Sequence, residues 1–167
     1  MDTLAQRPIT FNHLNAGLTL TGSATTYTTA ANTSTSIDGK FSTVLSSGAN
    51  ASPTTDAVTG AAFVAVTANK CCCLVWGVNA SGAIKLAQGP IIDTYVGVTT
   101  TVGAFLNAPQ FPPIPDNFCP IAYTLVRVSP TGSTFTPVTG SKNWDASGIS
   151  CTTPQNVSVL PSRPQIA

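Results

Sequence analysis

The sequence predicts an all-β fold: a single domain built as an antiparallel β-sandwich or a partly closed barrel, with extended N- and C-terminal arms. No stretch of twelve residues repeats apolar side chains at helical spacing without being cut by Gly, Pro or a β-branched run. Short runs rich in Thr, Val and Ile alternate instead with turn residues. The 167 residues, 43% of them hydrophobic, suffice for one core. We therefore assign residues 1–22 to an N-terminal arm, 23–160 to the β domain and 161–167 to a C-terminal tail.

The first strands are expected between residues 25 and 44. The sequence TTYTTA at residues 25–30 favours extended backbone, and residues 34–44 carry Asp38-Gly39 between alternating side chains. Asp-Gly in that setting is a strong signal for a type I′ turn, because both central residues need positive φ. We therefore expect a hairpin that turns at Asp38-Gly39.

The most apolar segment spans residues 61–79. Two apolar runs flank Ala68-Asn69-Lys70, which predicts a hairpin turning near Asn69, and a second turn at 79–82 leads to a third strand at 83–89. Together these segments predict a three-stranded meander. Its apolar surface would come from Phe63, Val64, Val66, Leu74, Val75, Trp76 and Val78.

The C-terminal half begins with a glycine-punctuated β-rich run at residues 93–108, followed by a proline cluster at 109–120. Prolines this dense cannot join a central ladder, so we expect an extended segment that crosses the end of the sheets. After it, alternating patterns and a turn at Pro130-Thr131-Gly132 predict the remaining strands, at residues 121–129, 134–138, 144–152 and 156–160.

The five cysteines are Cys71, Cys72, Cys73, Cys119 and Cys151. In a strand, side chains alternate between the two faces, so Cys71 and Cys73 should point one way and Cys72 the other. Consecutive cysteines lack the spacing of zinc ligands, and an odd count argues against a disulfide framework. We expect buried, reduced thiols that pack as small hydrophobic groups.

The composition argues against an enzyme. The chain has no glutamate, one histidine (His13) and six aspartates that stand singly, whereas acid–base catalysis draws on such groups in pairs. No phosphate-binding, dinucleotide-binding, metalloprotease or calcium-loop motif occurs, so we expect no catalytic residue, cofactor or metal. A net charge of +1 and scattered cations predict no binding to nucleic acid or to a membrane surface.

The N-terminal sequence MDTLAQRPITFNH lacks the pattern of a signal peptide, and no apolar run is long enough for a transmembrane helix. We therefore expect synthesis in a cytoplasm. Only 8% of the residues are charged, and so weakly charged a surface resists self-association poorly. Part of that surface is therefore expected to be covered in the working state.

Several short motifs, in their order along the chain, resemble a family of small all-β proteins encoded beside the major capsid protein of tailed bacteriophages. They cover the chain from about residue 37 to its end. These motifs are Asp38-Gly39-Lys40-Phe41, Pro53-Thr54-Thr55-Asp56, Thr59-Gly60-Ala61-Ala62-Phe63, Trp76-Gly77-Val78-Asn79-Ala80-Ser81-Gly82, Ala108-Pro109-Gln110-Phe111-Pro112, Asn143-Trp144-Asp145-Ala146-Ser147-Gly148-Ile149 and Leu160-Pro161-Ser162-Arg163-Pro164-Gln165.

The resemblance implies a capsid decoration (cement) protein, a non-enzymatic virion component that is commonly a homotrimer on the outer capsid surface. Its partner would be the major capsid protein, with no small-molecule substrate. The expected contact residues lie in the N-terminal arm and in the proline-rich segment: Leu4, Ile9, Phe11, Phe111, Ile114 and Phe118. The alternative is a head-fibre, tail-fibre or receptor-binding β module, which would share the Thr- and Gly-rich composition.

Overall fold

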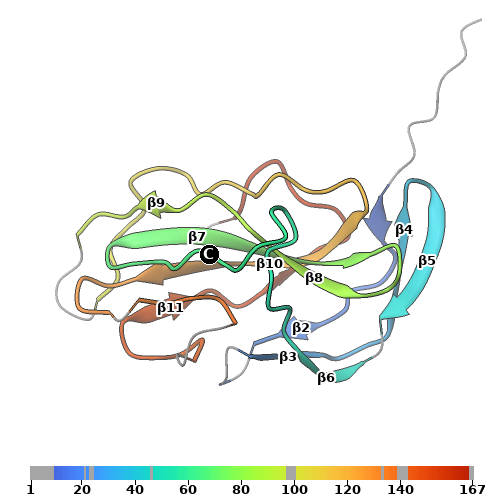
Figure 1. Cartoon of the computed structure of the whole chain (residues 1–167), viewed down its shortest axis with the longest axis horizontal. Helices are drawn as coiled ribbons and strands as arrows, with labels where there is room; N and C mark the ends of the chain where they lie inside the picture. Colours follow the sequence, from blue (N-terminus) through green and yellow to red (C-terminus); the bar gives the residue numbers. More distant parts are fainter. Residues whose placement is uncertain are drawn as a thin grey trace, which may run out of the picture.

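The computed structural model describes residues 10–20, 22, 25–45, 47–96, 101–132, 134–138 and 143–165, with the backbone alone for residues 42–45. The molecule is elongated, and its two longest strands run along the long axis (Figure 1). Every regular element within these ranges is a β-strand. The strands are β1 (Phe11–Asn12), β2 (Leu18–Thr19), β3 (Thr26–Thr29), β4 (Thr33–Ile37), β5 (Lys40–Leu45), β6 (Gly48–Ala51), β7 (Lys70–Asn79), β8 (Ile84–Gln88), β9 (Ile92–Asp93), β10 (Phe118–Val128), β11 (Ile149–Cys151) and β12 (Gln155–Asn156).

The described strands form three antiparallel sheets. The largest has the order β11-β10-β7-β8, with β12 also paired to β10 and β9 to β7. The two smaller sheets have the orders β1-β4-β5 and β2-β3-β6. The sheets do not close into a barrel, so the prediction of an antiparallel all-β sandwich is confirmed and the barrel alternative is not.

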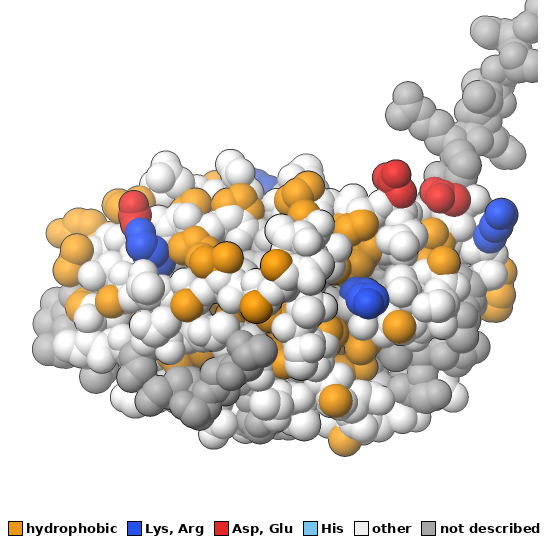
Figure 2. Space-filling view, viewed as in Figure 1, with side chains coloured by type: hydrophobic (Ala, Val, Ile, Leu, Met, Phe, Trp, Pro, Cys, Tyr) orange, Lys and Arg blue, Asp and Glu red, His pale blue; other side chains and the backbone are white. Residues whose placement is uncertain are grey.

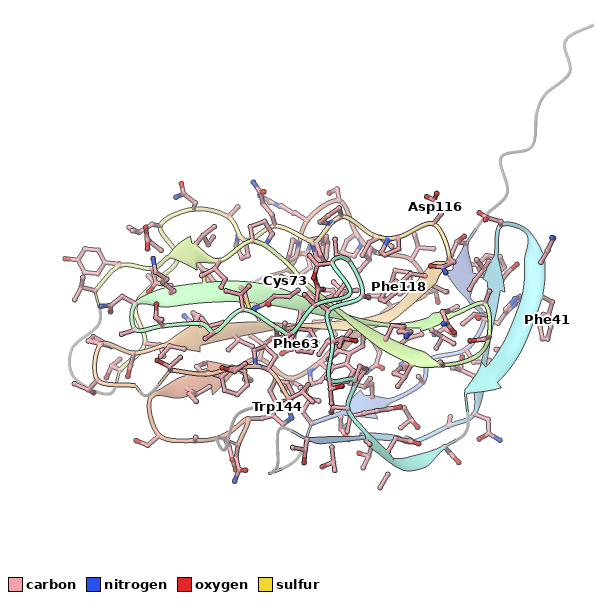
Figure 3. All side chains as sticks on the ribbon, in the orientation of Figure 1. Phe41, Phe63, Cys73, Asp116, Phe118 and Trp144 are labelled. Carbon is pink, nitrogen blue, oxygen red and sulfur yellow. The ribbon has the colours of Figure 1, made fainter. Side chains whose placement is uncertain are left out.

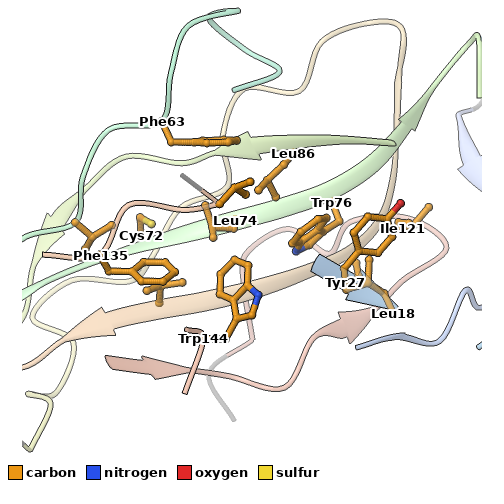
Figure 4. Close-up of a cluster of buried hydrophobic side chains, with 14 of the residues drawn as sticks. Leu18, Tyr27, Phe63, Cys72, Leu74, Trp76, Leu86, Ile121, Phe135 and Trp144 are labelled. Atoms are coloured by element: carbon orange, nitrogen blue, oxygen red, sulfur yellow. The ribbon is translucent and has the colours of Figure 1, made fainter. Parts of the chain in front are cut away.

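The long strands β7 and β10 form the centre of the molecule and are buried on both faces. Their side chains alternate between two core clusters. Cys72 and Val126 contribute to the larger cluster and Cys73 and Leu125 to the smaller one, as the strand period requires. Figure 4 shows the larger cluster, in which the rings of Tyr27, Trp76, Phe135 and Trp144 pack around the aliphatic side chains. The predicted alternation is confirmed for Cys72 and Cys73. The prediction of buried thiols is confirmed for Cys71, Cys72, Cys73 and Cys119, whereas Cys151 is half-buried.

The hairpin at Asp38-Gly39 is confirmed. Asp38 has a φ of 50° and Gly39 a φ of 74°, and Ile37 pairs with Lys40 across the turn. Both residues occupy the left-handed region that a type I′ turn requires. The turn at residues 79–82 also forms, with the amide of Gly82 donating to the carbonyl of Asn79 at 2.9 Å.

The expected strand in the apolar run before Ala68-Asn69-Lys70, residues 61–67, is wrong. Only Ala62 and Val66 in this segment make isolated bridges, to Thr55 and Phe135. The side-chain amide of Gln88 takes the place of a neighbouring strand there, because its oxygen accepts from the Val64 amide at 2.8 Å and its nitrogen donates to the Val64 carbonyl at 2.7 Å. The meander is thus reduced to β7 and β8, which do pair antiparallel.

The sequence predicts that the proline cluster ends before the next strand begins, but its last proline lies inside that strand. Pro120 lies inside β10, opposite Gly77, where the register shifts between Pro120 and Ala122. An irregularity in the ladder is one of the few places where a strand tolerates a residue without an N–H group. Residues 109–117 contain no strand, which agrees with an extended crossing segment.

The later strands are shorter than expected. The segment 134–138 makes only the bridge from Phe135 to Val66, and the segments 144–152 and 156–160 are reduced to β11 and β12. Within 93–108, Asp93 ends β9 and Thr94 bridges to Phe105, while residues 97–100 lie outside the described ranges. Apolar side chains in irregular segments, such as Phe135 and Trp144, enter the core without forming a ladder.

The chain ends lie against the sandwich over much of their described length. Residues 10–20 of the expected N-terminal arm contribute β1 and β2, and Ala16 and Leu18 are buried in the larger core cluster. At the other end, the Gln165 amide donates to the Tyr123 hydroxyl at 3.0 Å.

Candidate functional site

The expected contact residues of the N-terminal arm fall into two groups. Leu4 and Ile9 lie outside the described residues. Phe11 lies in β1, half-buried, and pairs with Ser36 of β4. Its ring lies 4.5 Å from that of His13 between centroids, and the His13 ring lies 5.3 Å from that of Phe41. The structure therefore adds His13 and Phe41 to the neighbourhood of Phe11.

The expected contact residues of the proline-rich segment differ in exposure. Phe118 is 2% exposed and belongs to the smaller core cluster. The expectation that Phe118 is a surface contact residue is therefore wrong. Phe111 is half-buried and packs edge-on against Tyr123 with ring centroids 5.1 Å apart. Ile114 is half-buried and lines an open groove of about 270 Å³ beside Asp38 and Asp116. Ile114 is therefore the half-buried member of this group that borders a surface depression, and the buried Phe118 contributes to the floor of the same groove.

One end of the molecule presents an aromatic cluster. Phe41 on β5 is 71% exposed and points outward at the end of the molecule away from β9 (Figures 1 and 3). Leu14, the residue after His13, is also exposed. We call Phe11, His13 and Phe41 the β5-end cluster. An exposed aromatic ring of this kind offers apolar area at a low cost in side-chain entropy.

The opposite end also exposes apolar side chains. Tyr95 and Val96, directly after β9, are 66% and 62% exposed, and Leu106 is 56% exposed. The Tyr95 amide donates to the Ala104 carbonyl at 2.8 Å, which brings the two segments together. We call Tyr95, Val96 and Leu106 the β9-end cluster. Figure 2 shows how sparse the charged side chains are on the face between the two ends.

A buried carboxylate that the sequence did not single out organises the loop beside β8. Asp56 is 5% exposed, and its Oδ1 accepts from the amides of Val58 at 3.3 Å and Gln88 at 2.9 Å. Its Oδ2 accepts from the Thr59 amide at 3.1 Å and the Thr59 hydroxyl at 2.8 Å. All four donors are protein groups, so the role of Asp56 is to fix residues 56–60 against the central sheet.

The cysteines form no reactive site. Burial raises the pKa of the Cys71 thiol to about 11 and those of Cys72 and Cys119 to about 12. Burial also raises the pKa values of Cys73 and Cys151. A thiol with a raised pKa carries little of the thiolate that nucleophilic or redox chemistry needs. The four buried thiols therefore act as packing groups, as the sequence predicted, whereas Cys151 is half-buried and borders an open groove.

An open groove with a volume of about 810 Å³ lies between the end of β2 and β11. Thr19, Leu20 and Trp144 contribute to its walls, together with the segment 149–154. Cys151 is the thiol in this lining, and its raised pKa keeps it protonated. The lining is mixed in polarity, and Asp145 is the one charged residue among the described residues that form it.

Comparison with known proteins gives no relative: no protein-family model, curated protein or solved structure matches this chain. No helix in the described part of the chain is long and apolar enough to cross a membrane. Within the same residues, no three His, Cys, Asp or Glu side chains are grouped as metal ligands would be.

Proposed function

We propose that this chain is a non-enzymatic virion protein that binds the outer surface of a phage capsid and staples neighbouring subunits of the major capsid protein. The proposal starts from the motifs between Asp38 and Gln165 that resemble capsid decoration proteins. The observation that carries it furthest is the pair of apolar clusters at opposite ends of an elongated sandwich.

Two separated contact clusters suit a stapling role. A single copy that binds one capsid subunit through the β5-end cluster and another through the β9-end cluster would resist their separation. Because the second contact forms within an existing complex, its effective concentration is high, and two weak contacts together hold tightly. The central sheet between the clusters, buried on both faces, would transmit load between them.

The low charge of the surface fits the same role. Charged side chains make up 8% of the chain and the net charge is +1, so no strong field would orient the protein toward an oppositely charged partner. Contact with the capsid would therefore rest on apolar side chains and on backbone groups of strand edges. Leu4, Ile9, Phe11, Phe111 and Ile114 stay in the proposed contact set, and Phe41, Tyr95 and Leu106 join it.

The test is an add-back experiment on particles that lack this protein. We expect the wild-type protein to saturate the particles at a fixed number of copies, and the double variant Tyr95→Ser/Leu106→Ser to bind at least ten-fold more weakly. Val64→Ser is the matched control, because Val64 is 64% exposed but belongs to neither end cluster. Equal binding by all three proteins would contradict the role of the β9-end cluster.

The alternative fibre or receptor-binding role predicts a different result in the same experiment. A fibre module would be present at only a few copies per particle, at the tail or at one vertex. It would bind host glycans. Saturation at a few copies would therefore favour the alternative.

A further inference from the structure

A polar groove of about 270 Å³ opens where three segments meet at one end of the central sheet. The loop 55–60 forms one wall, Asn79 and Lys85 of the β7–β8 hairpin form the second, and the segment 115–118 forms the third. The buried ring of Phe118 contributes to its floor. We call this depression the Lys85 groove. None of the described residues that line it belongs to the proposed capsid contact set.

The side chain of Lys85 is half-buried without a counter-ion. Lys85 lies in β8 two residues before Ala87, which belongs to the smaller core cluster, so both side chains leave the sheet on the same face. Lys70 is also half-buried, but it pairs with Asp93 at 2.5 Å, whereas no described carboxylate forms an ion pair with Lys85. Water lost from a cation is normally replaced by a counter-ion or by hydrogen-bond acceptors. The Lys85 ammonium therefore has capacity left for an anion.

The oxygen of the Asn79 side chain is occupied by the hairpin turn. It accepts from the Ser81 amide at 3.1 Å, the Ser81 hydroxyl at 2.8 Å and the Ala83 amide at 2.9 Å. These three donors fix which end of the side-chain amide is the oxygen, and its NH₂ group makes no hydrogen bond within the described residues. Asn79 therefore offers a ligand N–H donors and no free acceptor.

The other polar residues of the lining add donors and little acceptor capacity. Each oxygen of the Asp56 carboxylate is already occupied by two protein donors, which share its charge. The side chains of Thr55 and Asn117 are exposed and make no hydrogen bond within the described part of the chain. Asp116 lines the neighbouring groove beside Asp38 and not this one. The free groups of the Lys85 groove are thus one cation and several neutral donors.

We propose that the Lys85 groove binds a single carboxylate group, with the Lys85 ammonium as its counter-ion and the side-chain amides of Asn79 and Asn117 as its hydrogen-bond donors. A carboxylate has acceptors only and one negative charge, which matches one cation beside neutral donors. The carboxylate belongs either to a free acid or to an aspartate or glutamate side chain of a protein, and the two share this chemistry. The site goes beyond the proposed capsid role and does not depend on it.

The test is an NMR titration of the full ¹⁵N-labelled chain with sodium acetate, in which sodium chloride keeps the ionic strength constant. One partly exposed ion pair and two neutral hydrogen bonds bind weakly, so we expect a dissociation constant on the order of 10 mM. The side-chain NH₂ signals of Asn79 and Asn117 should shift together and saturate with that constant. Shifts that stay linear up to about 200 mM acetate would overturn the proposal.

Two lysine variants separate the site from a general effect of charge. Lys85→Met removes the charge and keeps an unbranched side chain, and it should raise the dissociation constant for acetate at least about ten-fold. Lys40→Met is the matched control, because Lys40 is exposed and lies outside the lining of the groove, and it should bind acetate as the wild type does. Equal shifts of the Asn79 and Asn117 signals in the wild type and in Lys85→Met would overturn the proposal. Far-UV circular dichroism and thermal unfolding establish that each variant is folded.

Two blocked tripeptides identify the source of the carboxylate. Gly-Glu-Gly carries one carboxylate on a side chain, and Gly-Gln-Gly is its neutral counterpart of the same shape. Tighter binding of the Glu peptide than of acetate would assign the groove to acidic side chains of a protein, and tighter binding of acetate would assign it to free acids. Equal binding of the Glu and Gln peptides would show that the groove does not recognise the carboxylate and would overturn the proposal.

Discussion

Replacing Asp56 by Asn changes one atom of a buried group that accepts four hydrogen bonds. In the better of the two amide orientations, the new NH₂ group occupies the Oδ2 position, where the Thr59 hydroxyl can rotate to accept from it. The Thr59 amide, which donates to Oδ2 at 3.1 Å, then faces another donor. In the other orientation the amides of Val58 and Gln88 both lose their acceptor. The first orientation is therefore favoured, with one donor left unmatched.

An unmatched buried donor costs about 1–3 kcal/mol, and hydrogen bonds to a charged acceptor are stronger than neutral ones. Thr59 is exposed, so water can partly replace the lost acceptor. We therefore expect Asp56→Asn to lower the free energy of unfolding by about 1–2 kcal/mol. Asp56→Ala removes all four acceptors and should cost about 3 kcal/mol or more.

The assay is urea unfolding followed by tryptophan fluorescence, with the slope of the transition unchanged between variants. Asp93→Asn is the matched control, because Asp93 pairs with Lys70 at 2.5 Å but its side chain is 69% exposed. An exposed pair contributes about 0–1 kcal/mol, so this variant should be close to wild type. Equal stabilities of Asp56→Asn and Asp93→Asn would refute the role assigned to the buried carboxylate.

Three further predictions concern the sheets and the thiols. Gly77→Ala should destabilise the protein by more than about 3 kcal/mol, because its Cβ would lie 2.2 Å from Phe118 Cε1 and 2.7 Å from the Cys119 carbonyl oxygen. Gly60→Ala, in open space but at a φ of +71°, should cost only about 1 kcal/mol, and the comparison is made by thermal unfolding. Asn156→Ala should cost about 1–3 kcal/mol, since it leaves the Leu18 amide and carbonyl without their partners, and a Leu18 amide that stays protected from exchange would contradict this. Alkaline pH should destabilise the protein, because burial raises the pKa of the Cys72 thiol from its ordinary value of 9.0 to about 12, so the contribution of this thiol to stability is complete below about pH 9 and is lost as the pH rises. Cys72→Ala should therefore flatten the pH dependence of the urea midpoint between about pH 9 and about pH 11.

Local sequence patterns predicted correctly those elements whose geometry depends on neighbouring residues alone. Asp38-Gly39 determines its hairpin through the φ values of two adjacent residues. β7 and β10 are long apolar runs, and burial on both faces requires that composition. The alternation of Cys72 and Cys73 between two cores follows from the strand period alone.

Non-local contacts explain what the sequence did not predict. The segment 61–67 looks like a strand, but the backbone hydrogen bonds of Val64 go to the side chain of Gln88, 24 residues away. Asp56 resembles an ordinary turn aspartate, and its buried role depends on the Gln88 amide, 32 residues away. No local pattern marks either long-range partner.

Candidate contact residues were the hardest to predict, because exposed and buried apolar side chains look alike in a sequence. Phe118 and Phe41 are both phenylalanines in strands, yet one is 2% exposed and the other 71%. What separates them is position: β10 is central, and β5 is an edge. Exposure of this kind follows from strand order, which periodicity does not encode.

The central claim is that this protein covers the outside of a capsid. Electron cryo-microscopy of purified particles, combined with gel-based copy number, tests it most directly. We predict hundreds of copies on the outer shell at local three-fold positions, with the β5-end or β9-end cluster against the major capsid protein. A handful of copies confined to the tail or to one vertex, or no copies on the particle at all, would contradict it.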